Sequence, residues 1–144
     1  MELAFQRLRD GASLPSAQHV GDAGLDLRAA EGTKVEPGAR AMIGTGVAVA
    51  IPDGHAGLVL PRSGLATKHG LTLANAPGLI DAGYRGEVIV AVVNLDRTDP
   101  IVIEPGDRIA QLVVVEVPDV RPAWVDELPT SERGSGGFGS TGRS

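Results

Sequence analysis

The sequence predicts an all-β domain followed by a flexible C-terminal arm. Short stretches rich in Val, Ile and Leu recur along the chain, separated by turn signals such as "EPG" (36–38) and "PDG" (52–54). Little of the chain shows helical periodicity, and the composition changes to Gly, Ser, Thr and charge after residue 128. These features favour an antiparallel β-sandwich, jelly roll or barrel over residues 1–128, with a Gly-rich arm over residues 129–144.

Six stretches have the alternation or the apolar runs that are typical of strands. They are "LAFQRL" (3–8), "AGLDLRAA" (23–30), "RAMIGTGVAVAI" (40–51), "EVIVAVVNL" (87–95), a strand and turn in "DPIVIEPGDR" (99–108), and "IAQLVVVEV" (109–117). Two of them, 87–95 and 109–117, are almost continuously apolar, which predicts strands buried on both faces and subunits that pack against each other. One short helix is predicted over "SGLATKHG" (63–70), with Ser63 as its N-cap and Gly70 at its end.

The composition excludes several classes of protein. Aromatic residues make up 3% of the chain, so the core must be aliphatic, and the absence of cysteine excludes disulfide scaffolds and thiolate sites. The formal net charge of −5 argues against a nucleic-acid partner, because general nucleic-acid binders are basic. The N-terminus is too charged for a signal peptide, and the apolar stretches are too short to cross a bilayer. We therefore expect a cytoplasmic protein with no membrane partner.

The segment "NAPGLIDAGYRGEV" (75–88) is predicted to form a hairpin or a pair of tight turns between strand-like flanks. Asp81 lies just before a turn, where its carboxylate could either cap that turn or act as a general base beside a pocket. Asn75 offers both a donor and an acceptor, which suits the edge of a nucleobase. Tyr84 belongs either to the core or to the wall of such a pocket.

Two further segments carry side chains suited to phosphate and cation binding. Arg62 and Ser63 of "PRSGLA" stand at the expected helix start, where main-chain N–H groups attract anions. Asp22 and Asp26 of "GDAGLDL" have the same parity on a strand. They either lie on a solvated face or help to hold a hard cation such as Mg²⁺ together with water and a phosphate.

The C-terminal stretch "RGSGGFGSTGRS" (133–144) contains a formal G-x-G-x-x-G match and one of only four aromatic residues in the chain. A dinucleotide fingerprint requires a preceding strand and a following helix, and a P-loop requires lysine where Gly139 stands, so neither motif applies. The stretch is either a disordered end or an arm whose Arg133 and Phe138 engage a phosphate and a base.

Five segments occur in a recognisable order over residues 22–142: "DAGLDL", "PRSGLA", "NAPGLIDAGYRGE", "GDRIAQLVV" and "RGSGGFGSTG". They resemble the five ordered motifs of the trimeric deoxyuridine triphosphatases (dUTPases), of which the third and the fifth are the most specific. The resemblance implies a jelly-roll-like β subunit in a homotrimer, with three active sites at the subunit interfaces. It also implies hydrolysis of dUTP to dUMP and pyrophosphate with Mg²⁺, which keeps uracil out of DNA and supplies dUMP for thymidylate synthesis.

The resemblance also implies roles for individual positions. Asp81 would activate the water that attacks the α-phosphorus, and Asp26 would orient the metal through water. Tyr84 would pack under the deoxyribose and leave no room for a 2′-hydroxyl. The other implied substrate contacts are Asn75, Gly78, Leu79, Ile80 and Ile89 for the nucleoside, Arg62, Ser63, Gly64 and Gln111 for the phosphates, and Arg133, Gly137 and Phe138 for the arm, which would close over a site on its own or a neighbouring subunit.

Two rival functions remain. The dCTP deaminases have the same fold, and the resemblance places their catalytic glutamate ten residues after the hairpin aspartate, where this chain has Ala91. Without that acid, deamination should fail. The second rival is a trimer that binds the nucleotide as a non-catalytic sensor, against which the intact Asp81 favours catalysis.

Overall fold

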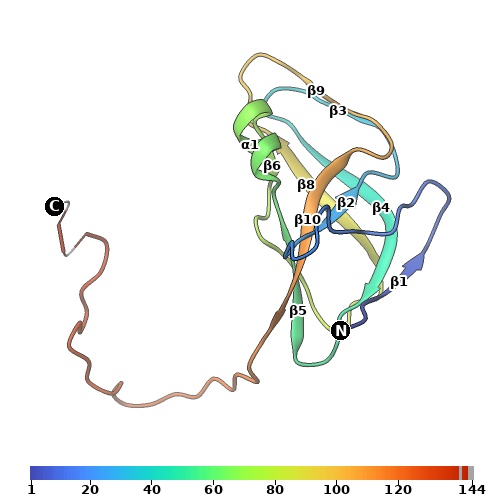
Figure 1. The fold of residues 1–144 in the computed structure, drawn as a ribbon. Coiled ribbons are helices and arrows are strands. Elements are labelled where there is room, and N and C mark those ends of the chain that lie inside the picture. Colours follow the sequence, from blue (N-terminus) through green and yellow to red (C-terminus); the bar gives the residue numbers. More distant parts are fainter. Residues whose placement is uncertain (140, 143–144) are drawn as a thin grey trace.

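The computed structural model describes residues 1–139 and 141–142 and consists of β-strands with one short helix (Figure 1). Residues 140, 143 and 144, which belong to the predicted arm, lie outside the described part. The elements in chain order are β1 (Ala4–Arg7), β2 (Leu25–Arg28), β3 (Thr33–Val35), β4 (Arg40–Ala50), β5 (His55–Leu60), α1 (Ser63–His69), β6 (Leu71–Leu73), β7 (Gly78–Ile80), β8 (Glu87–Asn94), β9 (Ile101–Ile103) and β10 (Arg108–Glu116).

Two four-stranded antiparallel sheets form the body of the molecule. Their strand orders are β1-β4-β8-β6 and β2-β10-β5-β7, and a small β3-β9 pair lies beside them. Many spatial neighbours are far apart in the sequence, as in β2 with β10 and β4 with β8, which is the connectivity of a jelly roll. The predicted all-β, jelly-roll-like fold with a single short helix is confirmed.

The core lies between the two sheets and is aliphatic, as the composition predicts. Ile43 and Val90 from one sheet, together with Leu27 and Leu112 from the other, have no solvent-exposed surface. The buried hydrophobic residues of the described chain include no aromatic side chain, and Phe5 packs against this cluster only partly buried. Branched aliphatic side chains fit between two pleated sheets, which explains how a chain so poor in aromatics builds a core.

The prediction that strands 87–95 and 109–117 are buried on both faces is wrong for the single chain. In β8, Val88, Val90 and Val92 are buried, whereas Ile89 between them is 46% exposed. Strand β10 likewise has only one fully buried face over most of its length. The reason is that one chain supplies only two layers, so the outer apolar face of each strand has no third layer over it.

The short helix ends as predicted but begins differently. Gly70 terminates α1 in the left-handed conformation with φ of 73°, and its N–H donates to the carbonyls of Ala66 and Leu65. Ser63 is not the N-cap, because the extended residue at that position is Arg62, with φ of −90° and ψ of 123°. No side chain caps the helix start, which leaves the first N–H groups of α1 available.

Asp96 closes the turn that follows β8. Its carboxylate accepts hydrogen bonds from the main-chain N–H groups of Thr98 (2.9 Å) and Asp99 (2.8 Å), and these bonds lower the pKa of Asp96 below its usual value of 3.8. A depressed folded-state pKa means that the carboxylate stabilises the fold above the unfolded pKa, and that this contribution is lost as the pH falls through the folded value.

We therefore expect Asp96→Ala to lower the melting temperature at pH 7 by on the order of 2 °C. The difference from the unmodified chain should shrink as the pH falls through the lowered folded-state pKa of Asp96, below which the carboxyl group is protonated in both states. Thermal unfolding followed by circular dichroism at pH 7 and pH 3 checks this. Asp96→Asn, which keeps an acceptor but has no charge, also cannot titrate at this position, so its deficit should shrink over the same pH range.

Beyond β10 the chain leaves the two sheets. The N–H of Val117 donates to the carbonyl of Gly54 at 2.8 Å, and no later main-chain hydrogen bond among the described residues reaches the β-sheets. Residues 117–139 contain no helix or strand, and Figure 1 shows this stretch running away from the body of the molecule. The described residues include no helix with the length and apolar character that a bilayer crossing requires.

Candidate active site

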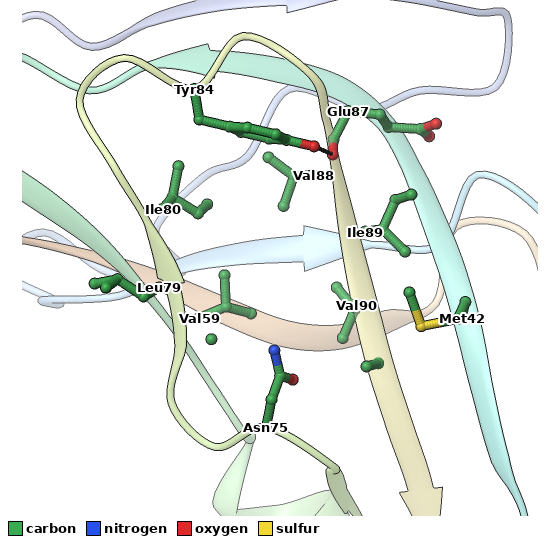
Figure 2. Close-up of a pocket in the computed structure, with 12 residues that line it drawn as sticks. Met42, Val59, Asn75, Leu79, Ile80, Tyr84, Glu87, Val88, Ile89 and Val90 are labelled. Carbon is green, nitrogen blue, oxygen red and sulfur yellow. Dashed lines mark hydrogen bonds between the residues drawn. The ribbon is translucent and has the colours of Figure 1, made fainter.

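A pocket of about 260 Å³ lies between the β7 segment and the beginning of β8 (Figure 2). The turn-rich stretch between β6 and β8 supplies one side of it, and β8 with the neighbouring β4 supplies the other. Its lining residues are Met42, Val59, Asn75, Gly78, Leu79, Ile80, Tyr84, Glu87, Val88, Ile89, Val90 and Ala91. The structure thus brings together all the nucleoside-contact residues predicted from the hairpin and from Ile89.

Asn75 lies at one end of the pocket, with its side-chain amide directed toward the interior (Figure 2). Gly78 pairs with Val59 across the β5–β7 ladder, close to that amide. A Cβ at Gly78 would lie 3.3 Å from Asn75 Nδ2 and 3.3 Å from the Val59 Cβ. A side chain at position 78 would therefore press on Asn75 and Val59, and glycine leaves the Asn75 amide its place in the pocket.

Tyr84 forms the opposite end of the pocket. Its hydroxyl donates to the Glu87 carbonyl at 2.9 Å, the bond drawn in Figure 2. The ring is 45% exposed and takes no part in the hydrophobic core, so of the two sequence-based alternatives the pocket wall is the one observed. A Cβ at Gly86 would lie 2.5 Å from the Tyr84 hydroxyl oxygen, so that glycine makes room for the ring.

Asp81 directly follows Ile80, which lines the pocket, but is not itself one of the lining residues. The turn that follows is closed by the main chain, because the Tyr84 N–H donates to the Asp81 carbonyl at 3.1 Å. Among the described residues the Asp81 carboxylate has no hydrogen bond and no ion pair, and the residue is exposed. The alternative that this carboxylate merely caps the turn is therefore not observed, and the group is available for chemistry.

A second cluster of candidate residues is built around the buried carboxylate of Asp26. Arg62 Nε lies 3.5 Å from Asp26 Oδ1, and Arg108 Nη1 lies 3.3 Å from Asp26 Oδ2. Arg62 Nη1 also donates to the Arg108 carbonyl at 3.1 Å, and Gln111 Nε2 donates to the Pro61 carbonyl at 3.0 Å. One carboxylate facing two guanidinium groups leaves a local excess of positive charge, as an anion-binding group requires.

Ser63 and Gly64 begin α1 directly beside Arg62, and both residues are exposed. Nothing lies within 4 Å of the position that a Cβ on Gly64 would take, so the surface there is open. The predicted phosphate-contact residues therefore meet in one place. By contrast, Asp22 lies apart from them: its carboxylate accepts from the His19 N–H at 2.9 Å in a local turn, on the exposed surface.

The pocket lies at the β7 edge of the β2-β10-β5-β7 sheet, apart from the cation cluster formed by Asp26, Arg62, Arg108 and Gln111. Gln111 is directly opposite both Leu60 and Asp26 in the strand ladders, so these three side chains point to the same face. Of the pocket residues, Val59 and Gly78 point to the core face, whereas Leu79, which is opposite Leu58, points to the outer face. None of the cluster residues lines the pocket.

The His, Asp and Glu side chains of the described residues do not form a closed metal-binding site. No group of three His, Cys, Asp or Glu side chains within residues 1–139 and 141–142 could hold a metal ion. Asp26 is the single carboxylate of the cation cluster, and both of its oxygens already face arginine. These residues fit a Mg²⁺ ion that is held mainly by water and substrate phosphates and that touches the protein through one carboxylate at most.

The predicted arm residues are not brought to either group. Arg133 Nε donates to the Gly136 carbonyl at 2.7 Å, and Gly137 is half-buried within the arm itself. Phe138 is fully exposed and has a left-handed φ of 46°, the one such value outside glycine in the described chain. The sequence did not predict Arg108 in the cluster, and it singled out Ala91 only as the position of an absent glutamate. The other unpredicted pocket residues are Met42, Val59, Glu87, Val88 and Val90. Arg108 lies within "GDRIAQLVV", so the motif itself carries a signal for it.

Comparisons with known proteins agree with this geometry. Residues 10–142 match the dUTPase family model. The chain is 57% identical to a deoxyuridine 5′-triphosphate nucleotidohydrolase of Leifsonia xyli subsp. xyli (90% of this chain, 85% of the relative). It is 54% identical to that of Mycobacterium tuberculosis (97% of this chain, 94% of the relative).

Solved structures show the same fold. The dUTPase of Staphylococcus bacteriophage 80alpha with dUPNHPP has a TM-score of 0.92 at 35% identity, covering 99% of both chains. A dUTPase variant of phage phi11 of S. aureus, whose structure describes a structural Mg(II) ion, has a TM-score of 0.84 at 30% identity, covering 90% of this chain and 100% of that one. Because the family model spans nearly the whole sequence and these relatives are aligned over 90% or more of it, the chain belongs to the dUTPase family.

Proposed function

We propose that this protein hydrolyses dUTP to dUMP and pyrophosphate, which keeps uracil out of DNA and supplies dUMP for thymidylate synthesis. The observation that carries the proposal is the arrangement of Asn75, Gly78 and Tyr84 around one pocket, next to whose lining residue Ile80 stands Asp81, with a carboxylate that is unpaired among the described residues. Membership of the dUTPase family and the dUTP analogue bound by a relative of the same fold support it.

Uracil is the base that this pocket fits. Asn75 supplies a donor and an acceptor, and the β7 main chain beside Gly78 comes close enough to add further hydrogen bonds. Thymine carries an additional methyl group, which a narrow pocket rejects sterically. Cytosine presents a reversed donor–acceptor pattern, so binding it would leave buried polar groups unpaired, which is the stronger form of discrimination. Tyr84 packs under the deoxyribose and excludes a 2′-hydroxyl.

Asp81 is the general base of the proposed reaction. Its carboxylate takes a proton from a water molecule, and the water oxygen attacks the α-phosphorus. The bond between the α-phosphorus and the bridging oxygen breaks, pyrophosphate leaves with the electron pair, and dUMP remains. A carboxylate with no competing partner among the described residues suits this role, because it can orient and deprotonate the water.

The triphosphate is held by Arg62, Ser63, Gly64 and Gln111. Arg62 and the free N–H groups at the start of α1 supply positive charge and donors, which an otherwise acidic protein needs where it binds a polyanion. Mg²⁺ on the phosphates, oriented by Asp26 through water, would neutralise charge that develops on the leaving group. Arg108 keeps Asp26 in place from the other side.

The active enzyme is a homotrimer whose sites combine residues of different subunits. None of the cation-cluster residues lines the pocket of the same chain, which favours a nucleotide shared between the pocket of one subunit and the cluster of another. The exposed Ile89 and Met42 give β8 and β4 an apolar outer face that a neighbour would cover. Residues 129–144 form the arm that closes over the bound nucleotide.

The segment that leads to the arm offers a direct test of assembly. Val120, Trp124 and Leu128 are strongly exposed in the single chain, and Trp124 is the one tryptophan of the sequence. In the trimer this segment should pack on a neighbouring subunit. We therefore expect blue-shifted tryptophan emission from the assembled protein and a red shift when dilution or mild denaturant separates the subunits, checked in parallel by light scattering. Emission identical to that of the unfolded chain under assembling conditions would contradict this packing.

A panel of nucleotides tests the activity itself. Pyrophosphate release should be rapid with dUTP and at least about a hundredfold slower with dCTP, dTTP and UTP, since each differs from dUTP by a group that the pocket rejects. Comparable rates with two of these nucleotides would refute the proposal. Ammonia should not be released from dCTP, because Ala91 occupies the pocket position at which an acidic side chain would be needed for deamination.

A further inference from the structure

The start of β8 is held by an unusual junction with β4. The β4–β8 register shifts between Gly44, which pairs with Ile89, and Ala48, which pairs with Glu87. The bulged residues of β4 therefore lack ladder partners on β8, and the side chain of Glu87 replaces one of these partners: its Oε1 accepts the Gly46 N–H at 2.7 Å.

Arg9, from the N-terminal segment, binds the same carboxylate oxygen. Its Nη2 donates to Glu87 Oε1, and its Nη1 lies 3.5 Å from Glu31 Oε2. The guanidinium crosses directly over Gly44, where a Cβ would collide with Nη2. A side chain at this position would therefore force the Arg9 guanidinium to move from its place beside Glu87.

Glu87 is also the residue to which the wall of the substrate pocket is attached. Its main-chain carbonyl accepts the Tyr84 hydroxyl at 2.9 Å, the one hydrogen bond that the Tyr84 side chain makes with the described residues. Figure 2 shows Tyr84 and Glu87 side by side at the same end of the pocket. Residue 87 is thus tied through its side chain to Arg9 and through its main chain to Tyr84.

We propose that Arg9 is a positioning residue for the pocket: through Glu87 it fixes the place of the Tyr84 ring and so sets how strictly the pocket rejects a 2′-hydroxyl. The assignment rests on the proposed function for the part played by Tyr84. The Arg9 and Glu87 side chains are 40% and 24% exposed, and ion pairs of this kind add little to global stability. Loss of the pair should therefore change specificity far more than the melting temperature.

Two variants remove the contact in different ways. Arg9→Ala deletes the guanidinium, while Gly44→Ala keeps both partners and inserts a methyl group between them. Each should raise kcat/KM for UTP relative to dUTP by about tenfold, the scale on which a pocket discriminates one small group. Arg9→Lys should restore part of the discrimination. Glu31→Gln is the matched control, because it removes the other carboxylate near Arg9 and leaves Glu87 in place.

A second readout does not depend on turnover. Tyr84 is the one tyrosine of the chain, so protein labelled with ring-¹³C tyrosine gives the ring signals of a single residue. Those signals should shift in Arg9→Ala and Gly44→Ala and stay unchanged in Glu31→Gln. Unchanged tyrosine signals in both variants would overturn the inference, as would equal losses of kcat/KM for dUTP and UTP, which indicate a merely structural role. Shifted signals in a protein inactive on dUTP would support the link while refuting the proposed function.

Discussion

Asp81→Asn should bind dUTP as tightly as the unmodified enzyme and lose nearly all turnover. Asparagine has almost the same shape, so the hairpin and its main-chain turn from Asp81 to Tyr84 should persist. It cannot accept a proton from water at neutral pH. Removal of a general base lowers the rate by about 10²- to 10⁴-fold, and we expect kcat to fall within that range.

Calorimetric titration with dUTP and single-turnover release of pyrophosphate separate the two effects. Asp22→Asn is the matched control: the same substitution falls on an exposed aspartate in a local turn of the first motif, outside the cation cluster, and should leave kcat unaltered. A kcat for Asp81→Asn close to that of the unmodified enzyme would remove Asp81 from the role of base. Loss of dUTP binding would instead mean that its carboxylate holds the substrate.

The long strands can be predicted because their signal is local. β4, β8 and β10 each have eight or more residues in which apolar side chains recur, and the expected and observed bounds differ by a residue or so. The sequence does not predict β5 or β3. β5 has six residues interrupted by Gly57, and β3 has three, so neither carries enough alternation to stand out from a loop. Their place is decided by pairing with β10 and β9.

The same distinction between local and long-range information applies to the residues of the candidate site. Asn75, Asp81 and Tyr84 lie within one short segment, so the local motif is enough to predict that they share a site. The surroundings of Asp26 depend instead on Arg62 and Arg108, which reach it from distant parts of the chain. No periodicity within "GDAGLDL" reveals whether its outward face meets solvent or two arginines. That information lies in the register of β10 with both β2 and β5, which brings Arg108 and Arg62 to Asp26.

Register also explains the missed pocket residues. Met42 and Ala91 face each other across the β4–β8 ladder, and together they close a side of the pocket that the hairpin sequence says nothing about.

At the helix start, a local sequence preference predicts the wrong residue as N-cap. Serine is a preferred N-cap residue, yet the extended backbone at Arg62 puts the helix boundary one residue before Ser63. Side-chain preference is a weaker determinant of that boundary than the path of the chain leaving β5.

Deletion of residues 133–144 should leave the trimer folded and lower kcat/KM for dUTP by on the order of a hundredfold or more, since the stacking of one aromatic ring and the charge-assisted hydrogen bonds of one arginine are both lost. The described arm contributes no main-chain hydrogen bond to the sheets after Val117 and no side chain to the core, so nothing in the fold depends on it. The glycines around Phe138 allow its main chain to approach phosphate closely.

Point substitutions at Phe138 can show whether the arm closes over the bound nucleotide or only extends from the domain without contacting it. Phe138→Ala should reproduce a large part of the loss, whereas Phe138→Tyr retains a ring that stacks and should recover most of the activity. Because Phe138 is fully exposed and Arg133 bonds only within the arm, neither has a role in the free enzyme that would mask the effect. Light scattering should show the same assembly for all three variants. If kcat/KM of the truncated enzyme equals that of the full chain, the arm does not close over the nucleotide, and the aromatic ring at its centre has no partner in the reaction.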